Sequence, residues 1–545
     1  MKKELRYTII NGLQSTVLQY SPIGWDKSII NIERSLKTWG ITRTYSIELR
    51  FPKDGAEILR NCFYNMLVNP VYLQIEKYDK ILMRYKIFYT GLIDFQDYED
   101  LETEVKISVV VMNLTAIIKK YFSETFYYGN HRSPTIREYY LSEDDKLKIS
   151  LYDDLERPLQ VVKISKLIEF VFYSMKDVTP EKFGCDLTAV TDIEDNDSYP
   201  VITTERAISG IDNTGLGADE YVYRGYSHRL SHLNTSFESI TTNLFNIYGL
   251  SWSVVVVDGI ETLKFNSLAD TFPATVFKKI ENLNNVTIRT SKDLTKGELF
   301  AGFDFQPDSD IFTYNNGSAT VQYNVNNEIV SSIKYDLNNK TSSNEMFDIR
   351  SSWQVDWFSI INKYFIDYEI IGSEDILQLI YVHDVDGVIC PVRDTKINSS
   401  TGISTISVGA KELSTRHIID NLKGLIKSLT ITPYVYVNYL EHYPTSIENF
   451  ITDFPDGIPK KEFSNFSIAD NERYFLPIEI EFEGVIPDID IIDMYEPANS
   501  LYEFDFEGNT YSGYLIKAEI NTSGKEKGKF TLLLHSENDF TKLIR

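Results

Sequence analysis

The sequence predicts an α+β protein that is mainly β, in which two small tube-like β-barrel domains at the chain ends bracket a mixed helix–hairpin middle region. Three observations lead to this prediction. Tyr occurs 36 times and Phe 31 times in 545 residues, and aromatic side chains favour the pleated, half-buried surface of a strand. Helix signals in the middle of the chain are followed by hairpin signals. A pair of strand signals near the N-terminus also resembles a pair near the C-terminus.

Length and composition indicate several folded domains. A chain of 545 residues holds roughly three to four domains of about 150 residues each. Hydrophobic residues make up 43% and charged residues 24%, which is the usual balance for a folded protein. The expected units are a β-barrel-like domain at 1–130, a middle domain with a helix and then a hairpin at 131–290, a second middle domain at 291–430 and a second β-barrel-like domain at 431–545.

The first domain is expected to place a helix among alternating strands. Tyr45–Phe51 alternates strictly between polar and apolar residues and predicts a half-buried strand. The helix after it should have Asp54 as its N-cap and Glu57 at the capping-box position. Further strands are expected at Ile87–Phe95 and Val105–Met112, on either side of an acidic stretch. The apolar helix face is expected to contain Ile58, Cys62 and Met66, with Cys62 buried.

A helix followed at once by a hairpin is expected after residue 234. Thr235 and Glu238 form a capping box, and Gly249 offers the left-handed residue that commonly ends a helix. Asp258-Gly259 then separates two runs of β-favouring residues, which is the strongest short signal for a hairpin. The buried helix face is expected to contain Phe237, Ile240, Leu244 and Ile247.

The same order is expected again further along the chain. A helix is predicted from about Ser352 to Tyr364, and its buried face should contain Trp353, Trp357, Ile360 and Tyr364. A hairpin turn is predicted at His383–Gly387. This turn begins like a calcium-binding loop, but Thr395 stands where such a loop needs Glu. A turn is therefore the favoured interpretation.

The two ends of the chain share a pattern. One strand near the N-terminus starts with the residues Tyr-Thr-Gly, of which the glycine is Gly91. After a polar gap comes an apolar strand with Lys106 near its start. A strand near the C-terminus starts with Tyr-Ser-Gly, of which the glycine is Gly513. Lys529, near the start of the next apolar strand, follows this glycine at almost the same sequence separation. Two interpretations stay open, a chance likeness between two hairpins or two copies of one small barrel.

Charge and cysteine content exclude several classes of protein. The formal net charge is −25, and binding to phosphates or anionic lipids needs clustered Lys and Arg. We therefore expect no specific nucleic-acid binding and no membrane association. The N-terminus lacks an apolar signal-peptide segment. Cys62, Cys185 and Cys390 show no disulfide or metal pattern, which favours thiols in a protein made in a reducing cytoplasm.

Motifs for catalysis or metal binding are weak. His228 and His232 lie four residues apart, but Arg229 stands where a zinc protease has Glu. Gly215 and Gly217 lie in a polar loop without the third glycine of a dinucleotide site. We predict no enzymatic activity and no catalytic, metal-binding or cofactor-binding residue. A glycan-cleaving pair of carboxylates stays open, because 79 Asp and Glu residues offer many pairs.

The barrel-like ends and the helix–hairpin middle resemble the hub and distal-tail proteins of tailed bacteriophages. Ser21–Asp26, Ile32–Arg34 and the turn from Phe51 to Leu59 are similar to tail proteins of phages that infect Bacteroidetes. This resemblance covers about the first 120 and the last 50 residues, and elsewhere only the pattern of elements. It implies a non-enzymatic structural component of the virion tail (hub or baseplate), made in the cytoplasm of the bacterial host.

The same resemblance implies partners. In such hubs, two tube-like barrels per chain in a trimer present a six-fold-like surface to a hexameric tail tube. We expect a homo-oligomeric ring, a trimer or a hexamer, that links the tail tube to host-recognition parts and contacts other phage tail proteins. The alternatives are a distal-tail ring subunit whose inserted domains bind glycans, or a carbohydrate-binding or glycan-cleaving protein.

One acidic stretch is a candidate for the wall of a DNA conduit, because a wall that repels phosphate lets DNA pass. A solvated loop or strand edge is the alternative interpretation. The stretch comprises Asp94, Asp97, Glu99, Asp100, Glu102 and Glu104.

Overall fold

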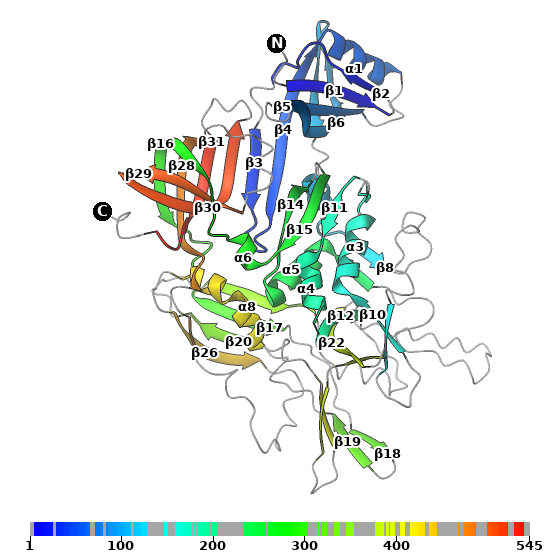
Figure 1. The fold of residues 1–545 in the computed structure, drawn as a ribbon, viewed down its shortest axis with the longest axis vertical. Coiled ribbons are helices and arrows are strands. Elements are labelled where there is room, and N and C mark those ends of the chain that lie inside the picture. The colour runs from blue at the N-terminus through cyan, green and yellow to red at the C-terminus, as the bar shows by residue number, and fades with distance from the viewer. Residues whose placement is uncertain are drawn as a thin grey trace, which may run out of the picture.

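The computed structural model describes residues 5–538 with gaps, the longest of which are 129–145, 205–232, 354–376 and 444–465. In this part the protein is mainly β with interspersed helices, which confirms the predicted fold class (Figure 1). One sheet of 15 strands occupies the upper half of the view in Figure 1, and smaller sheets and a closed barrel lie below it. Helices α3, α4, α5 and α8 lie between the large sheet and these smaller elements.

The N-terminal strands form a separate lobe of the large sheet. Its strands are β1 (Leu5–Asn11), β2 (Gln14–Val17), β4 (Ile41–Pro52), β5 (Val71–Asp79), β6 (Arg84–Asp100) and β7 (Glu104–Val110). They pair in the order β2-β1-β5-β6-β7-β4. An isolated bridge between Ile23 and Arg50 brings the chain after β2 back to β4. The lobe is therefore a curled sheet that comes close to closing on itself.

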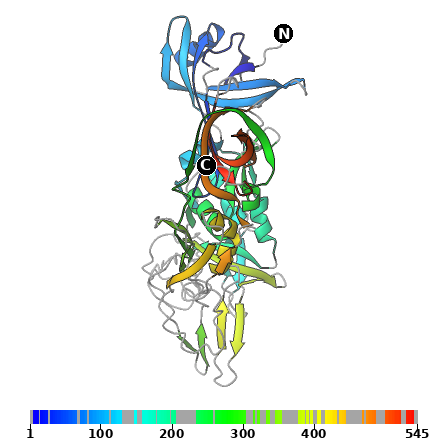
Figure 2. The same cartoon turned by 90° about the vertical axis from the view of Figure 1, so that its left-hand side faces the viewer.

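The C-terminal strands form a closed ring. Its strands are β16 (Val276–Thr290), β28 (Phe475–Val485), β29 (Leu501–Phe506), β30 (Asn509–Asn521) and β31 (Gly528–His535). They pair in the order β16-β28-β31-β30-β29, and β29 pairs back to β16 to close the ring. Figure 2 shows this ring end-on beside the C-terminus. Strand β16 completes the ring from a segment that lies nearly 200 residues earlier in the chain.

One long strand and one short strand join the lobe to the ring. Residues Ser46–Pro52 of β4 pair with β7, while residues Ile41–Ser46 pair with β3 (Ile29–Arg34). Strand β3 pairs on its other side with β30. Arg34 at the end of β3 is buried and donates a hydrogen bond from Nε to the Leu515 carbonyl at 3.0 Å. Its burial lowers the pKa of the guanidinium to about 10.

The two chain ends contain the same four-strand unit. Strands β4, β5, β6 and β7 pair in the order β5-β6-β7-β4, and β28, β29, β30 and β31 pair in the order β29-β30-β31-β28. All six of these pairings are antiparallel. Chain order and sheet order therefore agree between the units.

The register of the two units agrees residue by residue. The residue after Gly91, Leu92, pairs with Val110, four positions after Lys106. The residue after Gly513, Tyr514, pairs with Leu533, four positions after Lys529. The next pairs, Ile93 with Val109 and Leu515 with Leu532, agree as well, and an irregularity follows shortly after in both hairpins. This agreement supports the interpretation that the sequence repeat reflects two copies of one unit.

The middle of the chain contributes helices and small sheets. The helices are α1 (Asp54–Tyr64), α2 (Leu114–Tyr121), α3 (Ile164–Ser174), α4 (Thr188–Glu194), α5 (Phe237–Tyr248), α6 (Leu268–Thr271) and α8 (Thr415–Ser428). The barrel consists of β9 (Lys146–Ser150), β10 (Pro158–Lys163), β12 (Ser198–Thr204), β22 (Leu377–Val385) and β23 (Val388–Pro391). Three strands beside β4 extend the large sheet, β11 (Gly184–Asp186), β14 (Ser251–Val257) and β15 (Ile260–Asn266).

Three further sheets complete the described part. One contains β17 (Glu298–Phe303), β20 (Ser332–Asp336), β21 (Met346–Ser351), β26 (Val435–Tyr443) and β27 (Phe466–Ile468). Another contains β18 (Thr313–Asn316), β19 (Ala319–Tyr323), β24 (Arg393–Ile397) and β25 (Ser404–Val408). The smallest pairs β8 (Thr125–Tyr128) with β13 (Leu233–Ser236). The four-domain division stays a prediction.

Both helix–hairpin predictions can be compared with the structure. Helix α5 ends at Gly249, which has a φ of 67°, and β14 and β15 then form the expected hairpin. Strands β22 and β23 confirm the second hairpin, with Val385 paired to Val388. The helix predicted at 352–364 lies outside the described residues beyond Trp353, which is buried as expected.

Two predicted N-caps were wrong by one residue. Helix α1 begins at Asp54 with Lys53 as its N-cap, and Asp54 Oδ2 accepts a hydrogen bond from the Gln19 N–H at 2.5 Å instead. In α5 the N-cap is Ser236, whose Oγ accepts from the Ser239 N–H at 3.1 Å. Thr235 does not cap α5 because β13 continues to Ser236, so that the helix starts one residue later, at Phe237. Cys62 is buried as predicted, while Met66 lies outside the described residues.

A buried carboxylate takes the place of an N-cap side chain at α3. The Ser165 N–H and Oγ donate to the two carboxylate oxygens of Glu194, at 2.9 and 2.6 Å. Glu194 is 4% exposed, and its burial raises the pKa of the carboxyl above the ordinary value of 4.5. The end of α4 thereby fixes the start of α3.

We expect Glu194→Ala to lower the free energy of unfolding by about 2–3 kcal/mol, because both hydrogen bonds are lost and Ser165 stays buried. A carboxyl whose pKa is raised in the folded state contributes to the free energy of unfolding. This contribution is fully present below the unfolded-state pKa and is lost as pH rises through the folded-state pKa. Wild type should therefore lose stability relative to Glu194→Gln as pH rises above about 4.5. Urea unfolding over a pH series measures this, and a constant difference would contradict it.

Candidate functional site

The predicted acidic stretch lies on one hairpin of the N-terminal lobe. Asp94, Asp97, Glu99 and Asp100 belong to β6, Glu102 lies in the turn, and Glu104 begins β7. Glu102 has a φ of 64°, which lets the chain reverse tightly between the two strands. The side chains of Asp97, Glu99, Asp100 and Glu102 are exposed, and those of Asp94 and Glu104 are half-buried.

Three carboxylates of this stretch have a basic partner. Arg60 of α1 binds both oxygens of Asp100, at 2.9 and 2.7 Å, and this contact lowers the pKa of the Asp100 carboxyl. Lys106 Nζ lies 3.5 Å from Glu99, and Arg50 Nη1 lies 3.0 Å from Glu104. Ion pairs therefore hold the hairpin to α1 and β4. The basic partners also offset part of the negative charge that the sequence of the hairpin carries. A role in lining a lumen stays a prediction.

An exposed aromatic patch lies directly beside this hairpin. Phe63 of α1 stacks on Tyr98 of β6 with 4.1 Å between ring centroids and 6° between planes. Tyr64 packs edge-on against Phe63 and is 68% exposed, and Leu101 is 37% exposed. Phe95 also lies against Phe63. We define the aromatic patch as these residues, Phe63, Tyr64, Phe95, Tyr98 and Leu101.

The aromatic patch has the composition of a protein contact surface. Tyr and Phe are enriched in the cores of interfaces, and Phe63, Tyr64 and Leu101 are exposed here. The bidentate pair of Arg60 and Asp100 lies at its edge and fixes α1 against the hairpin. No pattern in the sequence indicates this surface, because Phe63 and Tyr98 come together only when α1 packs on β6.

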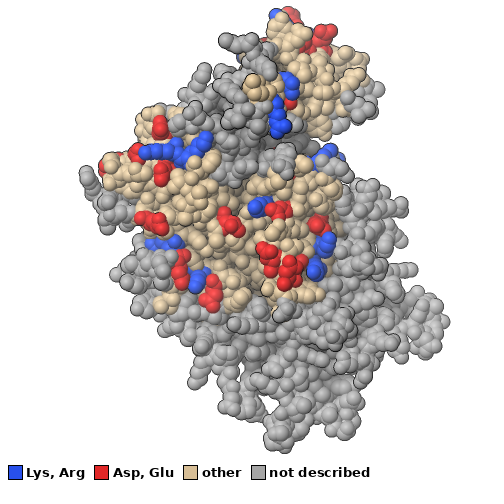
Figure 3. Space-filling model, viewed as in Figure 1, with Lys and Arg blue, Asp and Glu red and all other residues tan. Residues whose placement is uncertain are grey.

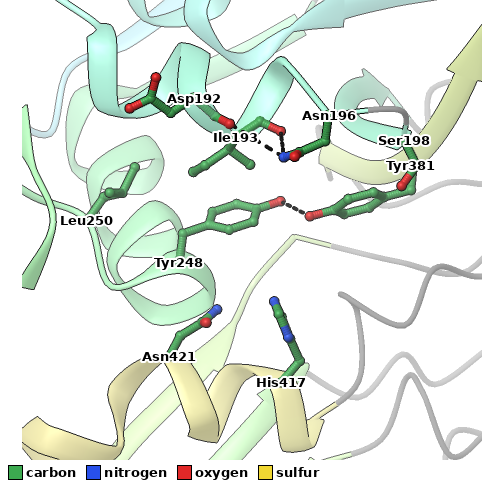
Figure 4. Close-up of a pocket in the computed structure, with 9 residues that line it drawn as sticks. All are labelled: Asp192, Ile193, Asn196, Ser198, Tyr248, Leu250, Tyr381, His417 and Asn421. Atoms are coloured by element: carbon green, nitrogen blue, oxygen red, sulfur yellow. Dashed lines mark hydrogen bonds between the residues drawn. The ribbon is translucent and has the colours of Figure 1, made fainter.

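A second feature is a cavity of about 520 Å³ between the helices and the barrel (Figure 4). Tyr381 of β22 and Tyr248 of α5 meet across it, with 3.2 Å between their hydroxyl oxygens. Figure 4 shows His417 and Asn421 reaching from α8 toward the two tyrosines, with Asn196 on the opposite side. The cavity thus draws on elements from widely separated parts of the chain.

Hydrogen bonds to the backbone orient both cavity amides. Asn421 donates from Nδ2 to the Ile247 carbonyl at 2.9 Å. Asn196 donates from Nδ2 to the carbonyls of Ile193 and Asp192, at 3.1 and 3.4 Å. Among the described residues no hydrogen bond reaches either amide oxygen. These two oxygens are therefore acceptors that the described residues leave unused.

The other sequence motifs supply no site in the described part of the chain. His228, His232, Gly215 and Gly217 lie outside the described residues. Among the residues that are described, no group of His, Cys, Asp and Glu side chains could hold a metal ion. No described helix has the length and apolar character needed to cross a bilayer. On the face in Figure 3, the described Lys and Arg side chains lie in small groups, with Asp and Glu side chains spread over the same face.

No protein-family model and no curated protein matches this chain. Similar solved structures include a 43 kDa tail protein of prophage MuSo2 from Shewanella oneidensis, with 9% identity over 98% of each chain and a TM-score of 0.36. A tail protein from Neisseria meningitidis has 7% identity over 97% of each chain and a TM-score of 0.36. A prophage tail protein from Listeria monocytogenes has 7% identity over 98% of this chain and 95% of that chain, with a TM-score of 0.33.

Proposed function

We propose that this protein is a non-enzymatic structural component of a phage virion tail, a hub or baseplate protein whose homo-oligomeric ring links the tail tube to host-recognition parts. One observation carries the proposal, the presence of the same four-strand unit at both ends of the chain. A trimer of such chains presents six copies of this unit, two from each chain. Three chains can therefore offer six similar contact surfaces to a tail tube with six-fold symmetry. The sequence resemblance to hub and distal-tail proteins points the same way.

The way in which the two units are joined supports this role. Backbone pairing through β3 connects β4 of the first unit to β30 of the second, so the two copies form one continuous sheet. A ring that bears load between a tube and a tip needs its repeated units at a fixed spacing. Backbone hydrogen bonds along a shared strand supply that rigidity better than a flexible linker does.

The aromatic patch is the surface that we assign to ring contacts. Closed rings need a surface on each subunit that fits its neighbour, and large exposed aromatic side chains commonly supply the apolar centre of such contacts. Other phage tail proteins are the remaining partners. The protein belongs, on this proposal, to the virion tail and is made in the cytoplasm of a bacterial host of the Bacteroidetes.

The acidic lumen belongs to this proposal as well. Asp97 and Glu102 are exposed on the hairpin of the first unit, and they would repel the phosphates of passing DNA. The matching segment of the second unit carries Lys525, Lys527 and Lys529 in the sequence. We therefore assign the repelling surface to the first unit alone.

Replacing Tyr64 and Leu101 together by Ser tests the contact surface. Both side chains are exposed in the protomer, so we expect the fold to keep its wild-type thermal stability. The ring should dissociate into single chains at roughly tenfold higher protein concentration than wild type, which corresponds to a loss of about 1.4 kcal/mol at each contact between neighbouring subunits. Light scattering after size exclusion over a dilution series measures the mass.

Met346→Ser is the matched control, because Met346 is also exposed but lies in β21, in a different sheet. It should leave the dissociation concentration unchanged. A wild-type protein that stays monomeric at every concentration would contradict the ring. Equal effects of the double variant and the control would contradict the assignment of the aromatic patch.

A distal-tail ring subunit is the second candidate within the same class. It differs from a hub by forming a hexamer, so the measured mass separates the two. The carbohydrate-binding alternative depends on a different part of the chain, the cavity beside Tyr248.

A further inference from the structure

The cavity between α4, α5, α8 and β22 has the lining of a ligand site. Its volume of about 520 Å³ falls within the range of about 300–1,000 Å³ that is typical of small-molecule sites. Ile193 and Leu250 supply apolar surface, and the tyrosine pair, His417 and the two amides supply polar groups. Tyr381 is 3% exposed, so one wall is part of the folded core. Packing thus holds Tyr381 in place before any ligand binds, while Asn196 lies at the exposed side of the cavity.

The charge of the lining restricts the class of ligand. Among the described lining residues there is neither Lys nor Arg, although either would be needed to bind a phosphate or a carboxylate group firmly. The carboxylate of Asp192 is the lone acidic group in the described lining, and Figure 4 shows it directed away from the tyrosines. Calcium or magnesium would require several oxygen ligands that include carboxylates. The cavity therefore favours a neutral ligand.

The hydrogen-bonding groups restrict the class further. The amides of Asn196 and Asn421 each donate an N–H to the backbone, and their oxygens accept no hydrogen bond from the described residues. Such oxygens accept well from hydroxyl groups. The rings of Tyr248 and Tyr381 and the side chain of Ile193 offer apolar surface for the C–H face of a saturated ring. A molecule with several hydroxyls on an apolar ring meets both requirements.

We propose that this cavity binds a neutral saccharide. The hydroxyls of one sugar ring would donate to the amide oxygens of Asn196 and Asn421 and contact His417, while the ring packs against the tyrosine pair. The inference goes beyond the structural role proposed above, and its test measures sugar binding rather than ring formation. Binding rather than cleavage is proposed, because no pair of carboxylates faces the cavity among the described residues.

Calorimetric titration of the full chain tests the proposal with defined probes. The neutral probes are glucose, galactose, mannose, rhamnose, fucose and N-acetylglucosamine, and the charged comparators are glucose 6-phosphate and glucosamine. We expect saturable binding of at least one neutral probe, and weaker binding of its charged counterpart. Absence of binding by every neutral probe, or tighter binding of a charged comparator, would overturn the proposal.

Two cavity variants and two matched controls locate the site. Asn196→Ala and His417→Ala should each weaken binding of that sugar about fivefold, the loss expected for one hydrogen bond. Asp195→Ala and Asp420→Ala change exposed residues next to the same positions that do not line the cavity, and they should keep wild-type affinity. Circular dichroism of all four confirms folding. Equal affinity in cavity variants and controls would place binding elsewhere and overturn the assignment.

Discussion

Trp39→Ala should lower the free energy of unfolding by about 3–5 kcal/mol, the loss expected for removing a fully buried large aromatic side chain. Trp39 is 1% exposed, and its ring lies 5.2 Å from the ring of Phe272 and 5.2 Å from that of Phe475. These three rings come from the segment between β3 and β4, from the end of α6 and from the start of β28. The substitution removes the contact that joins three parts of the chain.

Chemical denaturation measures this loss of unfolding free energy. It is followed by far-UV circular dichroism rather than by tryptophan fluorescence, because the variant lacks Trp39. Tyr64→Ala is the matched control, since Tyr64 is 68% exposed and its removal should change stability by less than about 0.5 kcal/mol. A Trp39→Ala protein with wild-type stability would show that the segment between β3 and β4, the end of α6 and the start of β28 do not share one core.

Gly513→Ala is expected to destabilise the C-terminal ring by about 1–3 kcal/mol, the usual effect of forcing extra volume into a packed site. A Cβ atom at this position would lie 2.6 Å from the Leu533 carbonyl oxygen and 3.1 Å from Leu532 Cβ. The nearest atom belongs to the backbone of the paired strand, so it cannot turn aside. The Tyr-Ser-Gly pattern at the start of this strand therefore has a steric cause.

Ser512→Ala serves as the control in the same strand. It adds no atom, and the backbone bond from the Ser512 N–H to Asn538 Oδ1 at 3.0 Å is kept. Hydrogen exchange of the β30 and β31 amides should accelerate in Gly513→Ala and not in Ser512→Ala. Unchanged exchange in both variants would contradict close packing of β30 on β31.

Local patterns in the sequence predicted local structure well. Gly249 ends α5 in the left-handed conformation because no other residue adopts it as readily. Asp258-Gly259 predicted its hairpin for a similar reason. The N-cap of α5 was placed at Thr235 instead of Ser236, because pairing of β13 with β8 decides where the strand stops and the helix starts. Sequence spacing does not contain that pairing.

Pairing between strands that are distant in the chain could not be predicted from the sequence. The closed ring needs β16 between β28 and β29, and nothing in Val276–Thr290 indicates a partner so distant in the chain. The cavity is hidden for the same reason, since Tyr248 and Tyr381 come together only in the folded chain. The repeat was visible because Gly91 and Gly513, with the lysines after them, occupy matching positions in both copies.

Images of the purified full-length protein test the central claim most directly. Negative-stain class averages at the peak of the size-exclusion profile show whether the chains form a closed ring and with what symmetry. We predict a ring around a central opening, with three chains and six similar density lobes, because each chain carries two copies of the four-strand unit. A population of compact single chains without a ring, at concentrations where the protein stays folded, would contradict this account.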